Sequence, residues 1–324
     1  MPFHPSSLPD LTGRTYIVTG ATSGIGFFTA SHLASHGAHV YICARTASKG
    51  ATTTSLIKST HPTANLSVLV LDHTRLSSVV AGAQDFLSKE TALHGLVNNA
   101  GIMATPYSIT EDGYEEQWQV NYLAHWVLTA WLMPVMRETA RASERGVVRI
   151  VNLSSYGHHS APGGGIDFED TSLKSTSNMA RYGQSKLANV LHVKTLHGLY
   201  GPGSEGEGEG EVWVSAVHPG LVSTSLDKKA ELPGFVRFLI APYRWIGGFV
   251  DADKGSWTSL FCAAAKEMKR EDCGKYWQRL ADPNGWQSSA AKDLELAERL
   301  EEWTKKEMTK GGWLVDDGKA SAQL

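Results

Sequence analysis

Several features that mark other protein classes are scarce or missing in this sequence. Its 324 residues include three cysteines, Cys43, Cys262 and Cys273, and no C-x-x-C pair. An odd number without that spacing argues against a disulfide framework or a zinc site and is typical of a reducing compartment. The histidines lack H-E-x-x-H spacing, and the adjacent His158 and His159 are expected to diverge on a helix or strand. We therefore expect no metal.

Neither sign of charge dominates the chain. It has 30 basic and 33 acidic residues, a net charge of -3. This balance gives no electrostatic reason to expect nucleic acid or an anionic membrane as partner, so a small molecule is the expected ligand. A hydrophobic content of 42% is enough to build a substantial core.

The sequence also lacks a recognisable signal sequence and a membrane span. Residues 1–14 contain neither a basic nor an apolar region of the secretory type. The most apolar window, 120–136, is too short to cross a bilayer and contains Asn121, His125 and Pro134. We expect a buried core helix there, no transmembrane segment, and a cytoplasmic protein.

Short apolar runs alternate with helical stretches along the first two thirds of the chain. Such alternation predicts a single α/β domain over 1–324, a doubly wound parallel sheet with helices on both faces. The runs read as strands are 14–20, 38–44, 65–72, 93–100, 147–155 and 212–220. Helical patterns return over 253–267 and 290–308, where Leu296, Leu300 and Trp303 share a face.

Two segments have compositions unsuited to a packed core. Residues 201–211 alternate Gly and Glu and bury too little apolar area to offset the entropy of ordering, which predicts a mobile surface loop. The last residues, 311–324, are expected to fray.

A glycine-rich turn follows the first predicted strand. Gly20, Gly24 and Gly26 lead into a helical stretch that stops at Gly37. Glycines permit a tight turn and let backbone N–H groups approach a pyrophosphate at a helix N-terminus. The spacing G-x-x-x-G-x-G also fits an ordinary glycine turn, but a P-loop is excluded because no Lys-Ser/Thr pair follows.

Four ordered motifs resemble those of the short-chain dehydrogenase/reductase family. They are "TGATSGIG" (19–26), "NNAG" (98–101), "YGQSK" (182–186) and "HPGLVST" (218–224), with "SSYGHH" (154–159) similar to the retinol-dehydrogenase-like branch. The resemblance spans about two thirds of the chain and weakens beyond residue 225. It implies a Rossmann fold, a nicotinamide cofactor and oxidoreductase chemistry.

The choice of cofactor can be argued from charge. Arg45 stands 19 residues beyond Gly26, with Lys49 nearby and no acid over 38–50, which favours the 2′-phosphate of NADP over NAD unless Arg45 is merely solvated. The resemblance implies that Asp72 contacts the adenine, that Asn98 steadies the sheet beside the ribose, and that Thr224 meets the nicotinamide. The full implied cofactor set is Gly20, Ser23, Gly24, Ile25, Gly26, Arg45, Asp72, Asn98, Ala100, Gly101, Tyr182, Lys186, Pro219, Gly220, Val222 and Thr224.

Tyr182 and Lys186 lie four residues apart in a helical segment and should share a face. Taken alone, such a pair is usually an incidental surface feature. In the family it resembles, the tyrosine is the general acid/base and the lysine favours its phenolate, which matters because a phenol has a pKa of about 10.

The resemblance implies two further catalytic residues. The substrate-binding serine aligns with Ser155, with Ser154 as the alternative, and residues 157–180 after it are expected to form part of the pocket wall. Asn121 aligns with an asparagine that holds a water linking the lysine to solvent, or is a helix asparagine that satisfies a kink.

The sequence gives little indication of the identity of the substrate. Residues 232–250 are expected to form a lid over an apolar ligand; the alternatives are a packing helix, or an amphipathic membrane contact through Arg237 and Arg244. The aromatic and aliphatic side chains behind this expectation are Phe235, Phe238, Leu239, Tyr243, Trp245 and Phe249.

These observations lead to one function and two rivals. The leading hypothesis is an NADPH-dependent carbonyl reductase that converts a hydrophobic ketone or aldehyde to an alcohol. The rivals are a cofactor-binding regulator or scaffold without turnover, and an isomerase or cyclase of specialised metabolism on the same fold. The family resemblance further suggests a homodimer through the helices that carry Asn121 and Tyr182.

Overall fold

Seven parallel strands form one sheet in the order β3-β2-β1-β4-β5-β6-β7. The computed structural model describes residues 3–204, 208, 210–222, 250–278 and 281–314. The strands are β1 Thr15–Val18, β2 His39–Ala44, β3 Asn65–Val70, β4 Gly95–Asn98, β5 Arg149–Leu153, β6 Trp213–Val217 and β7 Tyr276–Trp277. The six predicted strands are confirmed. The seventh was missed because two residues are too short to produce a pattern.

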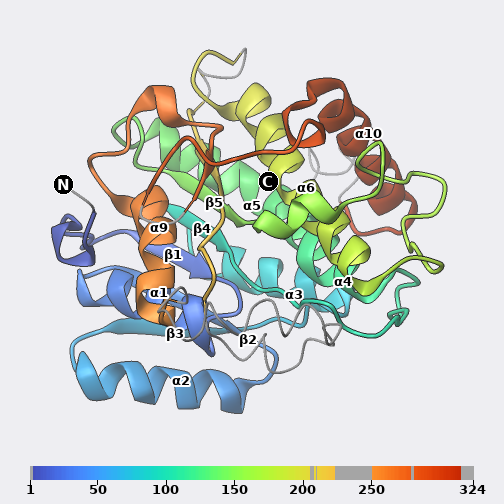
Figure 1. Cartoon of the computed structure of the whole chain (residues 1–324). Coiled ribbons are helices and arrows are strands. Elements are labelled where there is room, and N and C mark those ends of the chain that lie inside the picture. The colour runs from blue at the N-terminus through green and yellow to red at the C-terminus, as the bar shows by residue number, and fades with distance from the viewer. Residues whose placement is uncertain (1–2, 205–207, 209, 223–249, 279–280, 315–324) are drawn as a thin grey trace, which may run out of the picture.

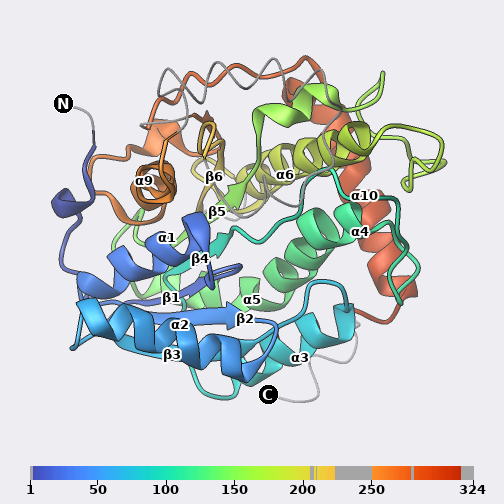
Figure 2. The same cartoon turned by 60° about the horizontal axis from the view of Figure 1, so that its bottom comes forward.

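Helices cover both faces of this sheet, as Figures 1 and 2 show. One face is covered by α1 Gly24–Ser35, α2 Ala47–Thr60 and α9 Ala252–Ala264, and the other by α3 Leu76–Leu87, α5 Ala124–Arg141 and α6 Asn178–Tyr200. The doubly wound Rossmann architecture is therefore confirmed, and α9 corresponds to the helix predicted over 253–267.

The remaining elements are mostly single turns. They are η1 Pro5–Ser7, α4 Glu116–Trp118, the π-helical turn η2 Gln119–Leu123, η3 Tyr156–Ser160, η5 Arg270–Asp272, η6 Ala290–Lys292 and the longer α10 Leu294–Lys310. α10 packs on the outer side of α6 through Leu296 and Leu300, which are buried. The predicted helix over 290–308 is confirmed, with a break at Asp293, the residue that caps α10.

The strands lie in the core of the molecule. Every residue of β1, β4, β5 and β6 is buried, as their continuous apolar sequence predicts for strands covered on both faces. Between β1 and β4 the order of the sheet reverses. In such sheets the connections at the carboxyl ends diverge at this point and leave a crevice, so ligands bind there.

Several predicted segments fall partly or wholly outside the described residues. Of the predicted lid, 232–250, only Val250 is described, and it pairs with Val222 in a single bridge. At the end of the Gly/Glu run Glu211 is buried, so this end is packed against the protein. In the predicted tail, the carbonyl oxygen of Trp313 accepts a 2.8 Å hydrogen bond from Trp131.

No helix among the described residues has the length and apolarity that a membrane crossing requires.

Buried histidines make the stability of this fold depend on pH. Burial lowers the pKa of His73 to about 4 and of His192 to about 3, and lowers the pKa of His125 well below its ordinary 6.5. These side chains stay neutral in the folded protein at a pH where the unfolded chain is protonated. Their contribution to stability is therefore complete above pH 6.5 and is lost as the pH falls toward 4.

We predict that the free energy of unfolding falls steadily between pH 6.5 and 4 and that His192→Asn makes this fall shallower. Asparagine keeps an acceptor for the Nδ2 of Asn152, which lies 3.3 Å from His192 Nδ1, but cannot titrate. Urea unfolding at a series of pH values measures the slope. His61→Asn, at a partly exposed position, is the control, and equal slopes for all three proteins would contradict the prediction.

Candidate active site

A cleft of about 470 Å³ opens at the carboxyl ends of the strands, where the order of the sheet reverses. It brings together residues from the glycine turn, the ends of β2, β3 and β4, and α6. Of the residues singled out in the sequence, those lining it are Gly20, Ser23, Gly24, Ile25, Gly26, Arg45, Lys49, Asp72, Ala100, Gly101, Ser154, Tyr182, Lys186 and Pro219.

The glycine turn is shaped by close backbone approaches. Gly20 and Gly24 have φ of +63° and +57°, which favours glycine. A Cβ on Gly26 would lie 2.4 Å from the Nδ2 of Asn99, so no larger residue fits. Helix α1 begins at Gly24, and the Ser23 side chain makes no capping hydrogen bond. The first-turn amides of α1 can therefore bind a pyrophosphate.

Charged and polar groups line the end of the cleft beside β2 and β3. Arg45 follows β2 and Lys49 lies in the first turn of α2. Asp72, after β3, accepts hydrogen bonds from the backbone N–H and hydroxyl of Thr74 at 3.0 and 2.9 Å. These side chains could hold the ribose and adenine of a dinucleotide, with Arg45 and Lys49 able to meet an added phosphate.

The hydroxyl of Thr19 holds the "NNAG" segment onto the end of β1. It accepts hydrogen bonds from the backbone N–H groups of Asn99 and Ala100 at 2.8 and 2.9 Å. The side chain of Asn99 in turn donates to the carbonyl oxygen of Thr19 at 2.8 Å. Because Thr19 is fully buried, these bonds fix the wall of the cleft between β1 and β4.

The same hydroxyl connects to the helix that carries Asn121. The Nδ1 of His125 lies 3.0 Å from the carbonyl oxygen of Asn121, which can only accept, so Nδ1 carries the proton. The Nε2 of His125 is therefore the acceptor for Thr19 Oγ1 at 2.9 Å and for His73 Nε2 at 3.1 Å.

The side chain of Asn121 makes three hydrogen bonds within the protein. It exchanges two hydrogen bonds with the backbone of Ile102, at 2.8 and 3.0 Å, and donates to Ser185 Oγ at 2.9 Å. Asn121 also lies in the π-helical turn Gln119–Leu123, so it occupies a local irregularity of the helix. Its position links the loop after β4 to α6.

Tyr182 and Lys186 share the face of α6 that lines the cleft, as their spacing predicts. The Lys186 Nζ lies 5.8 Å from the centroid of the Tyr182 ring and donates to the carbonyl oxygen of Leu153 at 3.0 Å. Burial lowers the pKa of Lys186 to about 8, so most of it stays protonated at neutral pH. A Cβ on Gly101 would lie 3.3 Å from this Nζ, so the loop after β4 closes over it.

The two candidate serines have different surroundings. The hydroxyl of Ser154 is buried and donates to the carbonyl oxygen of Lys186 at 2.7 Å. The hydroxyl of Ser155 accepts from the Gly157 N–H at 3.0 Å. A Cβ on Gly157 would lie 2.6 Å from the Tyr182 ring and 3.3 Å from Ser155 Oγ, so Ser155 is close to the phenol. Ser154 is among the residues that line the cleft, whereas Ser155 lies beside it and is partly exposed.

Some predicted residues, Asn121 and Ser155 among them, lie beside the cleft without lining it. Asn98 is buried and donates to Asn152 at 2.8 Å and Thr129 at 3.1 Å, which joins β4 to β5 and α5. Val222 is buried and packs against Gly255. Gly220 follows Pro219, which lines the cleft, and has a φ of +92°. Thr224 lies outside the described residues.

The expectation that His158 and His159 diverge was wrong. Both lie on η3, and their ring centroids are 4.2 Å apart. His158 Nε2 accepts from the backbone N–H of Ser288 at 3.1 Å, and His159 Nε2 donates to the carbonyl oxygen of Trp286 at 3.3 Å. A 3₁₀ turn differs from a helix or strand, and here both rings bind one carboxyl-terminal segment.

The sequence is similar to well-described proteins over most of its length. The profile described as "short chain dehydrogenase" matches residues 14–166. "Short-chain dehydrogenase/reductase drtF" of Aspergillus calidoustus is 45% identical over 95% of this chain and 98% of its own length. "Retinol dehydrogenase 12" of Homo sapiens is 38% identical over 90% of this chain and 84% of its own length.

The chain belongs to the short-chain dehydrogenase/reductase family. Within the family it resembles the retinol-dehydrogenase-like branch. A crystal structure of a protein from Mycobacterium paratuberculosis is 28% identical, with a TM-score of 0.72, over 95% of this chain and 98% of that one.

A second solved structure contains a cofactor. It is described as a "putative NAD(P) dependent gluconate 5-dehydrogenase" from Beutenbergia cavernae with bound NADP at low occupancy. The two chains are 25% identical, with a TM-score of 0.63, over 83% of this chain and 96% of that one. Members of this family bind a nicotinamide cofactor, and the glycine turn described above fits such a dinucleotide.

Sequence reasoning missed several residues of this short-chain dehydrogenase site. Thr19 and Asn99 lie inside the motifs "TGATSGIG" and "NNAG", where only their neighbours were singled out. His73 directly follows Asp72 and lines the cleft. Position inside a motif was the available signal for Thr19 and Asn99, whereas His125 carries no local signal because its side-chain partners, Thr19 and His73, are distant in sequence.

We predict that Thr19→Val weakens binding of the nicotinamide cofactor about tenfold and destabilises the fold by about 2 kcal/mol. Valine leaves two backbone N–H groups without their acceptor, and each buried unsatisfied group costs about 1–3 kcal/mol. Fluorescence titration with NADPH or NADH and urea unfolding measure the two effects. Thr19→Ser keeps the hydroxyl and should retain both properties; the same loss in this control would contradict the role of the hydroxyl.

Proposed function

We propose that this protein is an NADPH-dependent carbonyl reductase that converts a hydrophobic aldehyde or ketone to an alcohol. The observation that carries the proposal is the arrangement of the phenol of Tyr182 and the ammonium of Lys186. Both are buried on one face of α6 and line the same cleft as the glycine turn. A proton donor thus lies in the cleft that fits the cofactor.

The proposed roles follow from the surroundings of each residue. The bound nicotinamide supplies the hydride. Tyr182 gives its proton to the carbonyl oxygen, and the Lys186 ammonium beside it stabilises the phenolate that remains. The Ser155 hydroxyl binds the substrate oxygen and fixes its distance from the phenol. Asn121 holds the loop after β4 against α6, so that Lys186 keeps its place.

The preference for NADPH rests on the charges at the end of β2. Arg45 and Lys49 both line the cleft, so two cations are available to a 2′-phosphate. The structural relative from Beutenbergia cavernae, which contains NADP, is consistent with this preference. Reduction is the proposed direction because cellular NADP pools are mostly in the reduced form.

A hydrophobic substrate is supported by exposed aromatic side chains near the catalytic serine. Tyr156, next to Ser155, is 46% exposed, and Trp286 is 67% exposed with its ring centroid 5.9 Å from that of Tyr156. Exposed aromatic side chains of this kind suit an apolar ligand. The curated relatives named as retinol dehydrogenases make retinal a rational first probe. A cytoplasmic location and a homodimer stay predictions.

We predict that Tyr182→Phe lowers kcat/KM for reduction by about 10²–10⁴-fold, because general acid catalysis contributes on this order. The assay follows loss of NADPH absorbance with retinal and a panel of hydrophobic aldehydes and ketones. Leu199→Phe, an exposed position on α6, is the control. Equal rates for wild type and Tyr182→Phe would contradict the mechanism.

Two further measurements separate the rival functions. A wild-type protein that binds NADPH but consumes none with any carbonyl compound fits a regulator or scaffold. With deuterium-labelled NADPH, net reduction must leave the label in the product, whereas an isomerase or cyclase yields an unlabelled product.

We predict that Arg45→Asp lowers kcat/KM for NADPH by about 10–100-fold and raises it for NADH. The variant removes charge-assisted hydrogen bonds worth about 1.5–3 kcal/mol and supplies a carboxylate that can accept from a ribose 2′-OH. Lys58→Asp makes the same charge change at the exposed far end of α2 and should leave the preference unchanged. An unaltered NADPH preference in Arg45→Asp would overturn the assignment.

A further inference from the structure

A buried ion pair lies beside the proposed active site, between the starts of two helices. Arg181 lies in the first turn of α6, directly before Tyr182, and Glu115 caps α4, six residues before Asn121. The Arg181 Nε lies 3.4 Å from Glu115 Oε1, and the two side chains are 6% and 1% exposed. Arg181 is thus next to Tyr182 in sequence, and Glu115 begins the helical stretch that continues into the turn containing Asn121.

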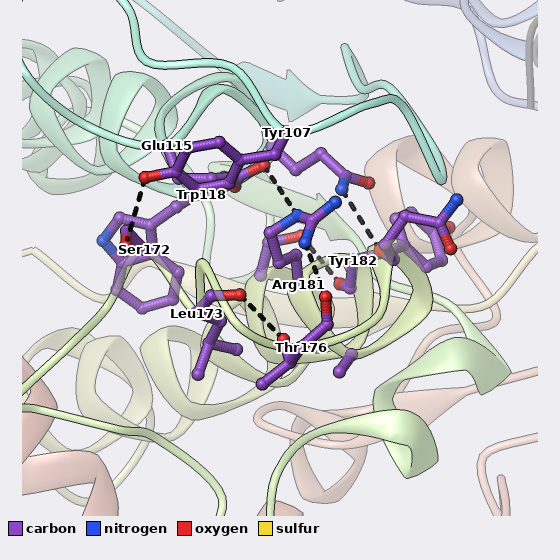
Figure 3. A network of polar contacts seen from close by, with 12 residues as sticks. Tyr107, Glu115, Trp118, Ser172, Leu173, Thr176, Arg181 and Tyr182 are labelled. Carbon is purple, nitrogen blue, oxygen red and sulfur yellow. Dashed lines mark hydrogen bonds and ion pairs between the residues drawn. The ribbon is translucent and has the colours of Figure 1, made fainter. Parts of the chain in front are cut away.

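Each partner makes further contacts that extend the network (Figure 3). Glu115 Oε2 accepts from the backbone N–H of Trp118 at 2.8 Å, which caps α4. The Arg181 Nη1 donates to the carbonyl oxygen of Thr176 at 2.9 Å. Its guanidinium lies 5.5 Å from the centroid of the Tyr107 ring. Arg181 therefore joins the segment before α6, the loop after β4 and the start of α4.

The starts of α4 and α6 also form hydrogen bonds with the loop that follows "NNAG". Ala104 has a φ of +51°, which is uncommon for a residue with a side chain, and is fully buried. Its N–H donates to Gln117 Oε1 at 2.8 Å, and its carbonyl oxygen accepts from Asn178 Nδ2 at 3.2 Å. Gln117 also donates to the carbonyl oxygen of Asn178 at 3.2 Å. Such a conformation persists where its surroundings hold it firmly.

Stability alone is a weak explanation for this pair. Burial raises the pKa of Glu115, and the backbone N–H groups of α4 together with Arg181 act against that shift. The desolvation of two charges commonly cancels their attraction, so an apolar pair of similar size would stabilise the fold about as well. An apolar pair would not supply the hydrogen bonds that each partner makes at its own helix start, to the N–H of Trp118 and the carbonyl oxygen of Thr176. Between the two side chains the attraction is one of charge, because Arg181 Nε and Glu115 Oε1 form no hydrogen bond.

We propose that the Arg181–Glu115 pair is a positioning element of the active site. It sets the helix that carries Asn121 against the helix that carries Tyr182 and Lys186, and holds the loop over 101–107 between them. The position of the Tyr182 phenol in the cleft then depends on a pair that does not itself line the cleft. Misplacement by about 1 Å is enough to lower a rate about 100-fold.

The kinetic test rests on the proposed function and compares Glu115→Gln, Arg181→Met and their double variant. Each should lower kcat about tenfold or more, with retinal or the best carbonyl of the panel, while the Kd of NADPH changes less than about twofold. The double variant should be no worse than the single ones, because the residues act as a unit. Arg181→Lys should recover part of the rate, because lysine restores the charge without the guanidinium fork.

A matched control breaks another ion pair of this protein. Glu211→Gln removes the partner of Arg270 at the amino end of β6, away from the cleft. It should leave kcat within about twofold of wild type. A double variant that is folded, by its thermal transition, and keeps wild-type kcat would overturn the proposal. So would an equal loss of kcat in Glu211→Gln.

A second measurement is independent of turnover. Amide hydrogen exchange should speed up in residues 102–118 and 172–182 of the double variant and stay unchanged over 213–217. Unchanged exchange in the first two segments would overturn the positioning role even if the wild-type protein reduced no carbonyl. Faster exchange in these two segments, with no wild-type turnover on any substrate, would support the positioning role of the pair and overturn the proposed reductase function.

Discussion

The burial of one ammonium group constrains the whole site. Lys186 lies in the interior with its Nζ on the carbonyl oxygen of Leu153, at the end of β5. A buried charge needs polar partners in fixed places, so the end of β5, the loop after β4 and the first half of α6 must meet at this point. Gly101 permits the close approach of that loop. Once these segments meet, the phenol of Tyr182 faces the cleft.

A polar framework behind the site keeps these segments together. Thr19 joins β1 to "NNAG", His125 joins Thr19 to Asn121, and Asn121 joins the loop after β4 to α6. Its members are contributed by different strands and helices, so it forms only after the sheet is assembled. Because interior hydrogen bonds reinforce one another, the framework favours a single geometry. The walls of the cleft are consequently fixed by interactions within the protein.

Much of this could be read from the sequence, and the reasons for the omissions are physical. The apolar runs predicted six strands because burial on both faces leaves a continuous signal, while β7 is too short to leave one. Tyr182 and Lys186 could be placed together from helical spacing alone. Thr19 and His125 are 106 residues apart, and Glu115 and Arg181 are 66 apart. Such partnerships depend on the packing of elements, which no local pattern encodes.

The contact of His158 with Ser288 has an evolutionary consequence. His158 also binds the carbonyl oxygen of Ser155 at 2.7 Å, so a single imidazole links the segment after β7 to the serine proposed to meet the substrate. The family profile matches residues 14–166, so this carboxyl-terminal segment lies outside the match. Substitutions in this carboxyl-terminal segment can therefore change which ligands the protein accepts, while the glycine turn, Tyr182 and Lys186 stay as they are.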